Sequence, residues 1–146
     1  MSDSDLINLY SGRILQLAAD IPHIGRLDTP QGTARRRSPL CGSTVTVDVI
    51  VKAGRVAAFA QDVRACALGQ ASAAVLGRVV IGRTLAELTE ARDAVGAMLK
   101  GGPIPPAPFD SYEVLIPARD FKNRHASILL ALDAVCEAMV EAEKAA

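Results

Sequence analysis

The alternation of apolar and polar residues predicts a short antiparallel hairpin near the middle of the chain. From residue 44 the period is two, with valines at positions 45, 47, 49 and 51 separated mostly by polar side chains. Ala53-Gly54 interrupts this run, and residues 55–63 are typical of the returning strand. The sequence therefore predicts a half-buried hairpin of residues 44–52 and 55–63.

Helical spacing of apolar residues predicts four helices, at 5–19, from 66 to about 81, after 84, and from about 120 to 143. Thr84-Leu85-Ala86-Glu87 is a capping-box pattern at the start of the third. Two segments are predicted to be surface connections: residues 25–39, with the run Arg35-Arg36-Arg37, and the proline-rich stretch 101–108. Segregated strands and helices indicate an α+β domain, a small antiparallel sheet with helices packed on one face.

The hairpin has a consequence for two cysteines. If Ala53 and Gly54 are the two loop residues, residue i faces residue 107 − i, which places Cys41 opposite Cys66. A three-residue loop with a glycine bulge would shift the register by one and leave the cysteines neighbours. Cys66 also begins a predicted helix, where free amides and the helix dipole favour a thiolate.

Three interpretations of the cysteine pair remain open: a metal or persulfide site, two small buried hydrophobic residues, or a reversible disulfide. His125, at the start of the last predicted helix, is a suitable third ligand beside two thiolates for zinc or iron. Cys136 is 11 residues further along, about 16 Å along a helix axis, and is predicted to be core. His23, in a loop, is predicted to be structural.

The amino-acid composition restricts the classes of function that the protein can have. The chain has 146 residues, 16 Lys and Arg against 16 Asp and Glu, 50% hydrophobic residues and 3% aromatic residues, which suits one domain and disfavours nucleic acid as a partner. The acidic N-terminus is unlike a signal peptide, and no run of about 18 apolar residues is present, so we expect a cytoplasmic protein without a membrane partner. Three cysteines in that compartment indicate metal or thiol chemistry rather than a disulfide framework.

Three motifs together resemble a known family. They are Pro39-Leu40-Cys41-Gly42 before the hairpin, Cys66-Ala67 with Ala71-Ser72 after it, and residues 21–27 near the N-terminus. Over about residues 5–140 the chain resembles the NifU/IscU/SufU iron–sulfur cluster assembly scaffolds. The resemblance implies a single NifU N-terminal or SufU-like domain over residues 1–146, with a three-stranded antiparallel sheet, helices on one face and a long C-terminal helix.

The resemblance also implies a ligand set. Cys41 and Cys66 match the first two cysteines of the family, and Ser43 stands where the family has aspartate. The third cysteine is missing: one alignment puts His125 in its place, whereas a second matches His125 to the histidine that precedes it and Ala126 to the cysteine. The candidate ligands are therefore Cys41, Cys66 and His125, with Ser43 as a further candidate, and Cys66 or Cys41 is a candidate persulfide acceptor.

The leading hypothesis is a scaffold that binds iron or a nascent iron–sulfur cluster, takes sulfur from a cysteine desulfurase and delivers to apo iron–sulfur proteins, as the resemblance implies. Such a protein carries its cargo and turns over no substrate. A zinc-dependent sulfurtransferase or sulfur acceptor is the enzymatic alternative. The third hypothesis is a metal-free interaction module that has lost the chemistry.

Overall fold

The computed structural model of the chain describes residues 11–39 and 42–145 and has an α+β architecture. Its elements, in order, are α2 (Gly12–Ala19), β1 (Gly32–Arg37), β2 (Thr44–Lys52), β3 (Arg55–Arg64), α3 (Ala67–Val79), α4 (Leu85–Leu99), the 3-10 helices η1 (Asp110–Asp120) and η2 (Lys122–Arg124), and α5 (His125–Ala145). None of the helices in this described part is both long enough and apolar enough to cross a bilayer.

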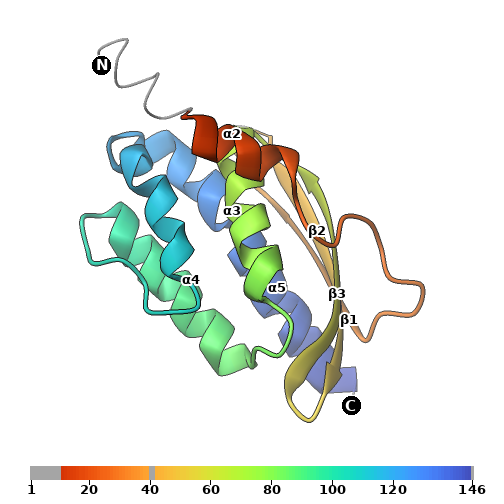
Figure 1. Cartoon of the computed structure of the whole chain (residues 1–146). Coiled ribbons are helices and arrows are strands. Elements are labelled where there is room, and N and C mark those ends of the chain that lie inside the picture. The colour runs from red at the N-terminus through yellow and green to blue at the C-terminus, as the bar shows by residue number, and fades with distance from the viewer. Residues whose placement is uncertain (1–10, 40–41, 146) are drawn as a thin grey trace.

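The three strands form one antiparallel sheet in the order β1-β2-β3, and the helices lie on one side of it (Figure 1). Long α5 crosses β1 and β2 on that side. Val45, Val47 and Val49 of β2 are fully or almost fully buried, because their side of the strand faces the helices. The predicted fold class, with its three-stranded sheet and long C-terminal helix, is confirmed.

Strand β1 corrects the prediction that residues 25–39 form only a surface connection. It pairs with β2 from Gly32 opposite Val49 to Arg37 opposite Thr44. The hydrophobic pattern missed this strand because the side facing α5 carries small residues, Gly32 and Ala34. A Cβ on Gly32 would overlap the backbone carbonyl oxygen of Ala138 in α5, so the absence of a side chain is what allows this close packing.

The hairpin between β2 and β3 has the predicted two-residue loop. Ala53 and Gly54 both have positive φ, 53° and 75°, which is the left-handed backbone that tight hairpin turns require. The predicted sum of 107 holds for Val51 opposite Val56, but a bulge then moves the register by one, so that Ile50 pairs with Ala58. The shift of one residue therefore arises from a bulge within the strands and not from a longer loop.

Helices α3 and α4 begin where the sequence indicates. Helix α4 has both hydrogen bonds of the capping box: Glu87 N donates to Thr84 Oγ1 over 3.1 Å, and Thr84 N donates to Glu87 Oε1 over 3.2 Å. The last helix begins at His125 and not near residue 120, because residues 110–124 form the two 3-10 helices. The first helix is described from Gly12, and the earlier part of that prediction lies outside the described residues.

Candidate functional site

Cys66 lies at the junction between the sheet and the helical layer. It is the residue before α3, follows β3 by two positions and is half-buried. Its own side chain makes no capping hydrogen bond, while its carbonyl oxygen accepts the first helical bond from Gln70 N over 2.9 Å. The sulfur therefore sits beside the amino end of a helix of 13 residues, as the sequence predicted.

Two serines meet the cysteine at this point. The Sγ atom of Cys66 is 3.5 Å from Oγ of Ser127, in the first turn of α5, and Ser127 Oγ–H donates to Oγ of Ser43 over 3.0 Å. Ser43, just before β2, is 3% exposed and Ser127 is 1% exposed, so both hydroxyls are withdrawn from solvent. Segments separated by 61 and 84 residues in the sequence therefore converge on one small polar cluster.

Ser127 is a site residue that the sequence reasoning missed. It belongs to a stripe of small buried residues along α5 that continues through Ala131, Ala134 and Ala138. Gly69 of α3 makes room for it, since a Cβ at Gly69 would lie 2.9 Å from Ser127 Oγ. A polar residue inside a stripe of alanines at helical spacing was the signal that could have identified it.

Cys41, the predicted partner of Cys66, lies outside the described residues, so the predicted pairing of the two thiols stays a prediction. Ser43, the further candidate ligand predicted from the sequence, is two residues later in the sequence and belongs to the polar cluster. The segment that follows Cys41 therefore does reach Cys66, through Ser127.

His125 is the first residue of α5, and its ring contacts the backbone. Its Nε2 atom is 2.8 Å from the carbonyl oxygen of Ala118 in η1, so with a donor hydrogen on Nε2 the other nitrogen, Nδ1, is the acceptor. Side chains two positions apart in a helix, such as those of His125 and Ser127, point in directions about 200° apart. Of these two residues, Ser127 is the one that contacts Cys66. The role of His125 as third ligand stays a prediction.

In residues 11–39 and 42–145, no three His, Cys, Asp or Glu side chains are grouped so as to hold a metal ion.

Cys136 is 4% exposed, and its Sγ atom lies 4.0 Å from Oγ1 of Thr89. Burial, partly offset by the hydrogen bond from Thr89, raises the pKa of the Cys136 thiol, which is typical of an unreactive core cysteine. His23, predicted to be structural, packs its ring edge-on against that of Phe59, with the two ring centroids 5.9 Å apart.

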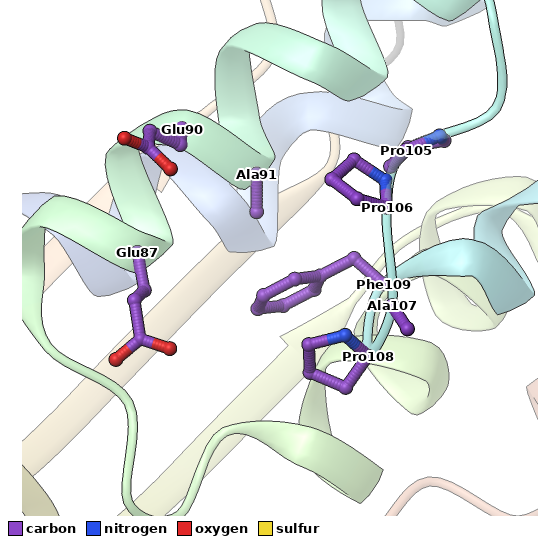
Figure 2. Close-up of a pocket in the computed structure, with 8 residues that line it drawn as sticks. All are labelled: Glu87, Glu90, Ala91, Pro105, Pro106, Ala107, Pro108 and Phe109. Atoms are coloured by element: carbon purple, nitrogen blue, oxygen red, sulfur yellow. The ribbon is translucent and has the colours of Figure 1, made fainter.

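The small pocket in Figure 2 is separate from this cluster. It measures about 100 Å³ and lies between α4 and the proline-rich stretch, where the ring of Phe109 points toward Ala91. Its lining contains Glu87 and Glu90 but neither cysteine nor histidine. The chemistry-bearing side chains therefore gather around Cys66 and not around this pocket.

The protein is therefore an α+β domain in which helices cover one face of a small antiparallel sheet. It carries a half-buried cysteine, Cys66, between the hairpin and the next helix. Residues 9–115 match the family model of the NifU-like N terminal domain. The chain belongs to that family, whose members are scaffolds for iron–sulfur cluster assembly.

Two solved structures are similar to the chain. The chain is 46% identical to a nitrogen-fixing NifU-like protein (N-terminal) from Brucella abortus, with a TM-score of 0.92 over 97% of this chain and 99% of that one. A protein assigned as a scaffold for the SUF system of Fervidobacterium islandicum is 19% identical, with a TM-score of 0.83 over 91% and 98% of the two chains, and supports the fold alone. Among curated proteins the comparison found no match.

Proposed function

We propose that this protein binds iron or a nascent iron–sulfur cluster through Cys41, Cys66 and His125 and passes it to apo iron–sulfur proteins. The observation that supports this most is the convergence of Ser43, Ser127 and Cys66, because it brings the segment that follows Cys41 to the sulfur of Cys66. Two thiolates and an imidazole form a donor set suited to iron or zinc.

Cys66 is the proposed sulfur acceptor. As a thiolate, the Cys66 sulfur at the amino end of α3 attacks the terminal sulfur of a persulfide on a cysteine desulfurase. A new S–S bond forms at Cys66, the S–S bond of the donor breaks, and the cysteine of the donor leaves as a thiolate. The half-buried position of Cys66 leaves part of the residue accessible to such a partner.

His125 would bind through Nδ1, because Nε2 is held by the carbonyl oxygen of Ala118. A histidine ligand commonly donates its second ring N–H to a carbonyl group, which fixes the tautomer and the orientation of the ring. Ser43 offers only a neutral hydroxyl in place of the carboxylate of the family, so we expect a more weakly held ion that is easier to pass on.

The test is anaerobic reconstitution with ferrous iron and sulfide, followed by iron and sulfide analysis and the visible absorption of a cluster. We expect the wild-type chain and Cys136→Ala to take up both, and Cys66→Ala, Cys41→Ala and His125→Ala to lose most of the uptake. Cys136→Ala is the matched control because it removes a thiol that is buried in the core.

Two outcomes contradict the proposal. Tightly bound zinc without any uptake of iron or sulfide supports the zinc-dependent sulfur acceptor instead. Full binding of a desulfurase and unchanged function in the double variant Cys41→Ala/Cys66→Ala support an interaction module without metal chemistry.

A further inference from the structure

The three consecutive arginines of β1 are divided between the two faces of the sheet. Arg36 lies on the side of the helices, where its Nη1 is 3.3 Å from a carboxylate oxygen of Glu137 in α5. Arg35 and Arg37 lie on the opposite, outer face, where they pair with Thr46 and Thr44 of β2. All three arginines of the run are exposed, but only two of them belong to the outer face.

A polar hollow lies on this outer face. It measures about 580 Å³ and combines arginines from a loop, from β1 and from the end of β3 with hydroxyl groups of the sheet. The lining residues are Arg26, Thr33, Arg35, Gly42, Thr44, Thr46, Asp62 and Arg64.

Positive charge on this face exceeds negative charge, although the whole chain is neutral. Two of its carboxylates are already engaged: Asp48 by Arg26 over 2.6 Å, and Asp62 by Arg64 over 3.8 Å. Within the part of the chain that the structure describes, Arg35 and Arg37 have no ion pair. Among the described residues, the outer face therefore has two guanidinium groups without an ion pair: Arg35, which lines the hollow, and Arg37, which lies opposite Thr44 of its lining.

We propose that the outer face of the sheet is a docking surface for an acidic, extended segment of a partner protein. Charge complementarity is the first argument, since guanidinium groups bind carboxylates at two points and the hydroxyls of Thr44 and Thr46 can donate further hydrogen bonds. Spacing is the second: Arg35 and Arg37 are one strand repeat of about 6.8 Å apart, which matches alternate side chains of an extended peptide.

A nucleic acid fits the same surface less well. None of the described residues that line the hollow is aromatic, so they offer no side chain on which a base could stack, and only 3% of the residues of the chain are aromatic. Gly42 stands at the edge of the hollow and directly before Ser43 of the polar cluster, so a docked segment would lie beside the proposed cargo site. The docking surface itself does not depend on the proposed function.

The test uses a fluorescein-labelled peptide of alternating glutamate and serine and measures its anisotropy at an ionic strength of about 0.02 M, where screening is weak. We expect saturable binding that Arg35→Gln weakens roughly threefold to fivefold, as for one exposed ion pair. Arg36→Gln is the matched control, since it removes the same charge from the adjacent residue on the other face. Arg64→Gln provides a second variant, in a strand at the opposite edge of the sheet.

Three results overturn the proposal. The first is an absence of saturable binding by the wild-type chain, and the second is an equal loss in Arg35→Gln and Arg36→Gln, which indicates unspecific attraction. The third is tighter binding of single-stranded RNA or inorganic polyphosphate than of the peptide with the same sensitivity to Arg35→Gln, which assigns the surface to a phosphate polymer.

Discussion

The carboxylate of Asp48 and the guanidinium of Arg26 form a two-point ion pair on the outer face of the sheet. The Nε and Nη2 atoms of Arg26 lie 2.6 and 3.1 Å from the two carboxylate oxygens. The amide of Leu27 and the hydroxyl of Thr33 donate to the same carboxylate over 3.0 and 2.7 Å. Asp48 of β2, which is fully buried, thereby holds the segment before β1, with Arg26 and Leu27, against the sheet.

Asp48→Asn should destabilise the protein by about 2 kcal/mol, because four donors lose their charged acceptor while the half-exposed Arg26 regains water. Urea unfolding followed by circular dichroism measures the free energy of unfolding. Asp62→Asn is the control: this half-exposed aspartate pairs with Arg64 over 3.8 Å, and we expect a change below about 0.5 kcal/mol. Equal losses in the two variants would show that the four-donor arrangement adds nothing to stability.

The same cluster predicts a pH dependence. Burial raises the pKa of Asp48, but hydrogen bonds from Arg26, Thr33 and Leu27, with the charge of Arg26, outweigh it and leave the pKa below its usual value. The unfolded chain therefore binds the proton more readily, so this stabilisation is complete above about pH 4, the usual aspartate pKa, and is lost as the pH falls through the lower pKa of the folded state. In acid titrations of unfolding free energy, Asp48→Asn should show a shallower decline than wild type; parallel curves would contradict this.

Substitution by alanine should have opposite effects on stability at two glycines, Gly32 and Gly96. Gly32→Ala places a methyl group in the backbone of α5, 2.7 Å from Ala142 N and still closer to Ala138, so the strand must move and we expect a loss of about 3 kcal/mol or more. A Cβ at Gly96 in α4 meets no atom within 4 Å apart from the adjacent part of its own helix, so Gly96→Ala should stabilise the protein by about 0.5–1 kcal/mol. Thermal melting of both variants is the measurement, and shifts of the same sign would be inconsistent with this packing.

Local features were predictable from the sequence because local chemistry produces them. The capping box at Thr84 and Glu87 needs only residues three apart, and the turn at Ala53-Gly54 needs only a break in an alternating run. The position of Cys66 at the beginning of a helix followed from the change of period after the hairpin.

Features that depend on packing between distant segments were not predictable. Strand β1 has little apolar signal because its inner side is kept small by the approach of α5, as Gly32 shows. The pairing of Arg26 with Asp48 joins residues 22 apart through a loop whose path no periodicity describes. Ser127 joined the cluster because Gly69 lets two helices approach, a relation that exists only in three dimensions.

The contact between Ser127 and Cys66 predicts where a third sulfur ligand would restore the usual donor set. Two thiolates bound at about 2.3 Å to one tetrahedral ion lie roughly 3.8 Å apart, close to the 3.5 Å between Cys66 Sγ and Ser127 Oγ. Ser127→Cys should therefore tighten zinc or ferrous iron at least about tenfold in competition with a chelator. Ala126→Cys, at the exposed neighbouring position that the second family alignment matches to the lost cysteine, is the paired variant, and we expect little change. Tighter binding by Ala126→Cys alone would place the metal on the other side of α5 and would favour that alignment.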